Sequence, residues 1–163
     1  REHLRLDQVP QSERAGVTPL ADIEAALTAV GPLPDVHAAA DKLLRLSEEV
    51  IEHWVTARGE EPTSELREGF RLLALHRQGA KGDPSFNACR ETCREIVYHY
   101  NLLTMQSEPA ETTNRLEMMK MISSHLYLFV SGKMQVAALG EFCCSAKPIR
   151  TSTDFDSGTT KEA

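Results

Sequence analysis

The segment 86–105, FNACRETCREIVYHYNLLTM, carries a strong helical repeat and constrains the fold more than any other stretch. Its apolar residues recur at alternating steps of three and four, which places their side chains on one side of an α-helix. The apolar positions are Phe86, Cys89, Cys93, Ile96, Val97, Tyr100 and Leu103. Charged residues fall on the other side, where water can solvate them. We therefore predict an amphipathic helix of about five turns with two cysteines in its core-facing stripe.

Similar repeats predict four more helices. The first spans 19–30, the second runs from 34 or 35 to 58, and the third runs from 63 or 64 to 78. The predicted solvent side of the second helix consists of Lys42, Arg45, Glu48, Glu49 and Glu52. The predicted inward side of the third helix consists of Leu66, Phe70, Leu73 and Ala74.

The fifth helix begins at 107–109, and the sequence leaves two places for its end. It stops at Gly132, or it passes through this glycine to Leu139. Its apolar set is unusually wide and comprises Leu116, Met118, Met119, Met121, Ile122, Leu126, Leu128, Phe129 and Val130. A helix that is apolar over so much of its circumference is buried centrally or lies in a homodimer interface.

The sequence contains neither alternating β-branched runs nor hairpin turns, so no strand pattern competes with the helices. Short connections favour antiparallel neighbours. We predict an all-α fold, an antiparallel helical bundle of four to five helices, spanning residues 18–146. The polar composition of the ends predicts a flexible N-terminal arm at 1–17 and a flexible C-terminal tail at 147–163.

The net charge of -6 argues against general nucleic-acid binding, which requires a basic surface. A local basic run consists of Arg67, Arg71, Arg77, Lys81, Arg90 and Arg94. Glutamates and an aspartate are interleaved with it, which is typical of a solvated mixed-charge face. No apolar run approaches the roughly 20 residues needed to cross a bilayer. The lack of a secretory signal predicts a cytoplasmic protein with reduced thiols, including Cys143 and Cys144.

Two histidines and two cysteines are the candidate metal ligands. Cys89 and Cys93 are separated by four residues, so their sulfurs are neighbours on one helix face. With His99 and His125 they could bind Zn or Cu(I), because thiolates and imidazoles are the ligands that these ions prefer. Core packing is the competing interpretation and is favoured, because cysteine behaves as a small buried hydrophobe. His125 stands among apolar residues, which favours a core position for it.

No catalytic signature or phosphate-binding loop is present in the sequence. We therefore expect a small protein that acts by binding, either to itself or to a protein partner, with neither nucleic acid nor membrane as a partner. The first alternative is a metal- or thiol-based sensor or storage bundle that uses the Cys89 and Cys93 face. The second is a helical enzyme or ligand-binding bundle with a pocket near His99 and His125.

Overall fold

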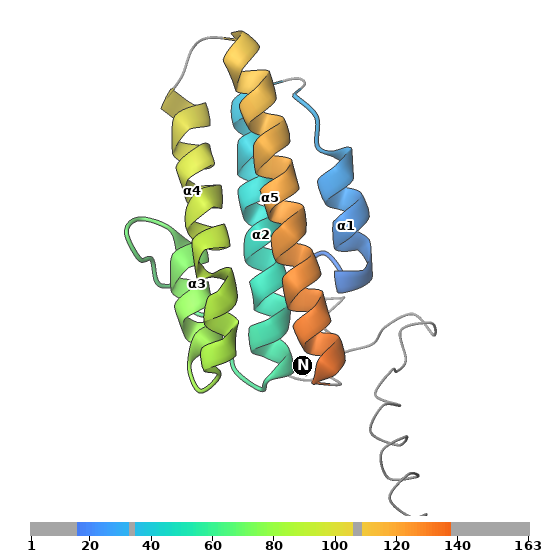
Figure 1. The fold of residues 1–163 in the computed structure, drawn as a ribbon, viewed down its shortest axis with the longest axis vertical. Coiled ribbons are helices and arrows are strands. Elements are labelled where there is room, and N and C mark those ends of the chain that lie inside the picture. The colour runs from blue at the N-terminus through green and yellow to red at the C-terminus, as the bar shows by residue number, and fades with distance from the viewer. Residues whose placement is uncertain (1–15, 33–34, 106–108, 138–163) are drawn as a thin grey trace, which may run out of the picture.

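The computed structural model describes residues 16–32, 35–105 and 109–137 and shows an all-α helical bundle (Figure 1). The elements are α1 (Leu20–Ala29), α2 (Val36–Ala57), α3 (Arg71–Ala80), the 3-10 helix η3 (Pro84–Cys89), α4 (Arg90–Met105) and α5 (Pro109–Val136). Figure 1 shows α1 and α4 running opposite to α2 and α5, as the short connections predicted. The predicted tail and almost all of the predicted arm lie outside the described residues.

Helix α2 is the long element against which α1, α3, α4 and α5 all pack. Asp35 caps its N-terminus, because the carboxylate accepts a hydrogen bond of 2.9 Å from the backbone N–H of His37. At its other end Gly59 has a φ of +87°, a left-handed conformation that glycine adopts without strain. The prediction of a helix that starts at 34 or 35 and ends near 58 is therefore confirmed within two residues at each end.

The core contains a stacked aromatic pair at the end of α2. The rings of Trp54 and Phe86 lie 4.9 Å apart with an interplanar angle of 7°. The indole N–H of Trp54 donates a 2.9 Å hydrogen bond to the carbonyl of Gly79. A Cβ at Gly79 would lie 2.9 Å from the Trp54 ring, so only glycine allows α3 to approach this closely. This packing explains why Gly79, in the last turn of α3, is buried.

The predicted third helix was wrong in its first half, since α3 begins only at Arg71. Residues 61–70 form an extended loop that ends in a tight turn, in which Arg67 and Phe70 exchange two backbone hydrogen bonds of 3.0 Å. Glu68 and Gly69 have φ values of +55° and +86°, and two consecutive left-handed residues cannot continue an α-helix. Leu66, predicted to face inward, is 65% exposed.

The predicted solvent side of α2 was also wrong. Glu49 and Glu52 are buried, and Arg45 and Glu48 are only partly exposed, while Lys42 alone of the five is fully in solvent. Carboxylates avoid the interior unless they are paired, and these carboxylates are paired with arginines. The amphipathic pattern of α2 therefore identified its apolar face correctly but misjudged the opposite face.

Helix α5 passes through Gly132 and ends at Val136, which settles the question of its length. It packs against α2, α4 and α1, so the central position is confirmed for one side of the helix. The buried side consists of Leu116, Met119, Ile122, Leu126, Val130 and Met134. The opposite side faces solvent and includes His125, which is therefore not a core residue as predicted. In the described part of the chain, the helices are all too short or too polar to span a membrane.

The segment 86–105 is helical as predicted, but its first turn has 3-10 rather than α geometry. Pro84 opens this turn, where a missing backbone N–H costs nothing. Phe86, Cys89, Cys93, Ile96, Val97 and Leu103 are buried, so the predicted stripe is confirmed for those six residues.

Candidate binding groove

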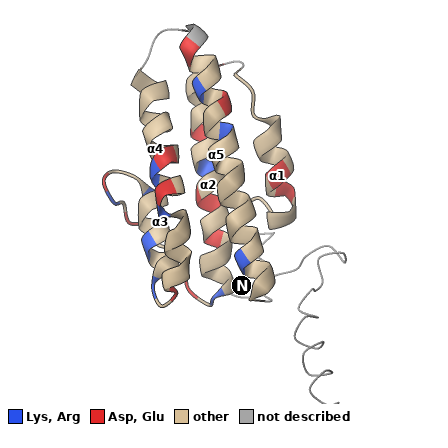
Figure 2. Cartoon of the chain, in the orientation of Figure 1, with Lys and Arg blue, Asp and Glu red and all other residues tan. Residues whose placement is uncertain are grey.

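A groove of about 1060 Å³ lies beside α3. One wall is the extended loop that precedes α3, and the other is formed by η3 and the first turns of α4. Figure 2 shows Lys and Arg on α3 and the segments next to it, interspersed with Asp and Glu. The groove is lined by Glu60, Thr63, Glu65, Leu66, Arg67, Leu73, Ala74, His76, Arg77, Gln78, Ala80, Lys81, Asn87, Arg90 and Arg94.

The lining contains five cationic side chains and only two carboxylates, those of Glu60 and Glu65. Arg94 forms a two-pronged ion pair with Glu68, with N–O distances of 2.9 and 3.2 Å. Arg77 and Lys81 have no ion-pair partner among the residues that the structure describes. The mixed-charge face predicted from the sequence is therefore a concave surface with an excess of positive charge.

Side chains of α3 hold the loop wall of the groove in place. The backbone N–H of Thr63 donates a 2.8 Å hydrogen bond to Oε1 of Gln78, and its carbonyl accepts a 2.8 Å hydrogen bond from Nε of Arg71. Gln78 also donates a 2.8 Å hydrogen bond to the carbonyl of Glu61. Because an extended loop lacks the ladder of a helix or sheet, these bonds satisfy its backbone and fix its distance from α3.

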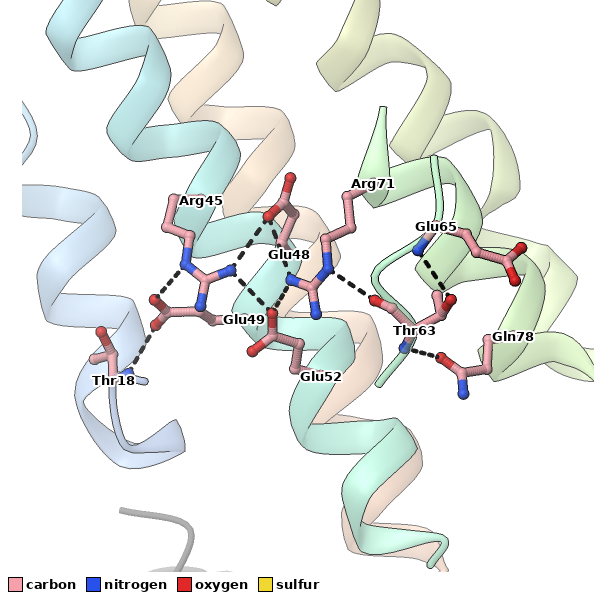
Figure 3. A network of polar contacts seen from close by, with 9 residues as sticks. All are labelled: Thr18, Arg45, Glu48, Glu49, Glu52, Thr63, Glu65, Arg71 and Gln78. Carbon is pink, nitrogen blue, oxygen red and sulfur yellow. Dashed lines mark hydrogen bonds and ion pairs between the residues drawn. The ribbon is translucent and has the colours of Figure 1, made fainter. Parts of the chain in front are cut away.

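Arg71 is itself held by a group of buried charges, which we name the inner cluster: Arg45, Glu48, Glu49, Glu52 and Arg71 (Figure 3). Glu52 pairs with both arginines, at 2.9 Å from Arg45 and in direct contact with Arg71. Glu49 pairs with Arg45 at 3.1 Å and accepts a 2.7 Å hydrogen bond from the backbone N–H of Thr18. Burial raises the pKa of Glu48, against the opposing effect of Arg71 and Arg45.

The inner cluster joins three parts of the molecule, namely the segment before α1, the middle of α2 and the groove wall. His53 extends it, because its Nε2 lies 2.7 Å from the carbonyl of Thr18 and must donate to that oxygen. Burial lowers the pKa of His53, although Thr18, Glu49 and Glu52 oppose this. Local sequence patterns do not predict this arrangement, since Arg71 lies 19 residues from Glu52 along the chain.

The two cysteines are one helical turn apart, and Cys89 lies beside His76, which lines the groove. Cys89 is 2% exposed and Cys93 is fully buried, and both are free thiols. The sulfur of Cys89 lies 3.3 Å from the carbonyl oxygen of Phe86, and Nε2 of His76 lies 3.2 Å from the same oxygen. Cys93 and His76 lower the pKa of Cys89 to about 6, and the pairing with Cys89 raises the pKa of Cys93.

The other two predicted metal ligands lie elsewhere. His99 is half-buried on α4, where its Nδ1 accepts a 3.3 Å hydrogen bond from Arg115. Burial and the positive charge of Arg115 lower the pKa of His99. His125 is exposed on α5. Within the described ranges, no group of three or more His, Cys, Asp or Glu side chains could hold a metal ion. Cys143 and Cys144 fall outside those ranges.

A second surface, on the outer side of α5, is apolar instead of charged. Residues 121–132 contain no Asp, Glu, Lys or Arg, and Figure 2 shows this stretch of α5 without charge colours. Met118, Met121 and Leu128 are 44%, 49% and 56% exposed. They recur with helical spacing and form one stripe, which we name the α5 outer face.

No family model, curated protein or solved structure matches this chain. The groove, the α5 outer face and the pair of Cys89 and Cys93 are therefore the features that indicate a function.

Proposed function

We propose that the protein is a binding module whose groove takes an acidic, extended segment of a protein partner. The observation that carries the proposal is the set of groove cations, of which Arg77 and Lys81 lack partners in the described structure, on a chain whose net charge is -6. A protein with an excess of carboxylates has enough of them to neutralise every surface cation. Positive charge that stays uncompensated around a groove favours a negatively charged ligand that supplies the missing partners.

The composition of the groove favours a peptide over a nucleic acid. Leu66 is 65% exposed at the groove, and Leu73 and Ala74 also contribute to its lining. A peptide can combine carboxylates with an apolar side chain that packs on Leu66. A long polyanion would instead be repelled by the remaining surface of the acidic protein. The ligand class that fits both properties is a short acidic segment with one large apolar residue.

The test is fluorescence anisotropy with a labelled Glu-rich peptide that carries one leucine, at low and physiological salt. Arg77→Glu is expected to weaken binding by at least about tenfold, because it places a repulsive charge in the groove. Lys42→Glu is the matched control, since it makes the same charge change at an exposed site of α2 outside the groove. Amide chemical shifts should change mainly in residues 60–94.

Three results would overturn the proposal. The first is a lack of binding by the parent protein. The second is an equal loss of affinity in the two variants, which would mean that only overall charge matters. The third is tighter binding of single-stranded DNA of equal charge at the same residues, which would replace the peptide by a nucleic acid as the ligand.

The α5 outer face supports a second candidate function, self-association with a second copy of this chain. Its exposed methionines and leucine are the side chains that association would remove from water, and residues 121–132 contain no Asp, Glu, Lys or Arg. Sedimentation should then detect a dimer that Met121→Glu converts to monomer, while Met105→Glu, an exposed change on α4, leaves the dimer intact. A parent protein that is monomeric at about 100 µM, well above the range of stable dimers, would rule this candidate out.

A further inference from the structure

The thiol pair under the groove has a geometry that neither of the proposed binding functions uses. Cys89 ends η3 and Cys93 lies one turn further on α4, so their side chains are stacked on the same face of the helix. Both side chains are buried, so the two sulfurs lie next to each other in the core. His76 of α3 lies beside Cys89, because both side chains contact the carbonyl oxygen of Phe86.

The spacing of the two cysteines disfavours a direct S–S bond. Residues four apart on a helix have Cβ atoms about 5–6 Å apart, whereas a disulfide requires about 3.5–4.5 Å. Oxidation to a disulfide would therefore distort the first turn of α4. A single atom placed between the two sulfurs would instead bridge the longer distance without that distortion.

The donor set also selects among metal ions. Structural zinc takes four ligands in a tetrahedron, and no group of three or more candidate ligands exists within the described residues. Cu(I) is a soft ion that is satisfied by two thiolates, and it has no need of further oxygen or nitrogen ligands. We propose that Cys89 and Cys93 bind one Cu(I) ion between their sulfurs.

The binding step balances as an exchange of protons for metal. One Cu(I) ion and two thiols give a bis-thiolate complex of charge -1 and release two protons.

His76 also gives the ion a path to the sulfurs. It is one of the groove-lining residues, although it is itself almost fully buried. It therefore separates Cys89 from solvent as the floor of the groove. Movement of this one side chain opens the sulfur to a Cu(I) ion carried by a small thiol, by ligand exchange.

The experiment is a titration of the full chain with Cu(I), in the presence of a reductant and the competing chelator bathocuproine disulfonate. Cys143→Ser and Cys144→Ser are introduced first, so that Cys89 and Cys93 are the remaining thiols. We expect one Cu(I) per chain. Replacing either Cys89 or Cys93 by Ser should lower the affinity more than about a hundredfold, since each supplies half of the coordination. His125→Gln is the control and should leave binding unchanged.

A parent protein that does not compete with the chelator, or a Cys93→Ser variant that binds as tightly as the parent, would overturn the proposal. Circular dichroism checks that the serine variants remain helical. If they do not, X-ray absorption at the copper edge of the loaded parent decides instead. Two sulfur neighbours support the site, and a nitrogen or oxygen neighbour in the first shell contradicts it.

Discussion

The inner cluster and the groove are built from the same kinds of residue, yet they have opposite properties. Both combine arginines with glutamates, and they even share a border, since Arg71 belongs to the cluster and holds Thr63 of the groove wall. In the cluster, each charge has partners, and the three carboxylates have little access to water. In the groove, Arg77 and Lys81 face solvent, and among the described residues neither has an ionic partner.

This difference separates a structural role from a binding role. Buried charges that compensate one another determine how segments are joined, because leaving one of them unpaired is costly. Exposed charges that are not compensated contribute little to folding and remain able to meet a ligand. Pairing and burial, rather than the type of residue, therefore identify the surface that acts on other molecules.

The largest expected effect comes from breaking the inner cluster. Glu52→Ala removes the carboxylate that pairs most closely with both Arg45 and Arg71, and leaves them Glu48 at 3.3 and 3.6 Å. We expect a loss of about 2–4 kcal/mol in the free energy of unfolding, at the low end for buried ion pairs because both arginines are partly exposed. Urea denaturation followed by circular dichroism measures it. Glu95→Ala, an exposed change on α4, is the control, and equal stability of the two variants would mean that the cluster is not structural.

The sequence predicted the fold where side-chain periodicity reflects burial, and it failed where long-range pairing decides. The stripes of α2 and of residues 86–105 were found because apolar side chains need one shared face. Glu52 was placed in solvent because its partner Arg71 belongs to another helix, and Glu49 because its partner Thr18 lies before α1. Leu66 and Phe70 have helical spacing, but the left-handed turn at Glu68 and Gly69 interrupts it. Local pattern alone could not reveal that turn.

The site was predictable only in part for the same reason. The groove cations were recognised as a basic run, but the shape that leaves Arg77 and Lys81 without an ion pair among the described residues depends on the loop before α3. His125 has apolar neighbours in sequence, which suggested the core. It nevertheless lies outside the buried stripe of α5, since neighbours along a helix point in different directions.

We expect a smaller loss of unfolding free energy when the pH is lowered and His53 becomes protonated. Burial lowers its folded-state pKa below the ordinary value of 6.5, so protonation favours the unfolded chain. Its contribution to stability is present above pH 6.5 and is lost as the pH falls through the lowered pKa. His53→Gln, which can still donate to Thr18, should flatten the decline of the unfolding free energy between neutral and mildly acidic pH.

The pKa of His99 is lowered as well, so its protonation also reduces the unfolding free energy as the pH falls. The variant His99→Gln measures this contribution separately. The raised pKa of Glu48 acts in the opposite direction, because protonation of this carboxyl favours the folded chain. It acts in a more acidic range, around and above 4.5. A decline that is as steep in His53→Gln as in the parent would contradict the assignment to His53.

The smallest expected effect on stability comes from Arg94→Gln at the edge of the groove. This change tests the same comparison by removing an exposed ion pair instead of a buried one. Arg94 and Glu68 form an ion pair as short as those of the inner cluster, but both side chains are exposed. The pair lowers the pKa of Glu68 through its hydrogen bond to Arg94, yet water and salt screen such charges effectively. We expect Arg94→Gln to leave the urea midpoint unchanged at both about 50 mM and about 500 mM salt. The same variant should weaken binding of the acidic peptide, because it removes a groove cation. If its stability fell as far as that of Glu52→Ala, geometry alone would determine the strength of these pairs, and burial would not be what distinguishes the cluster from the groove.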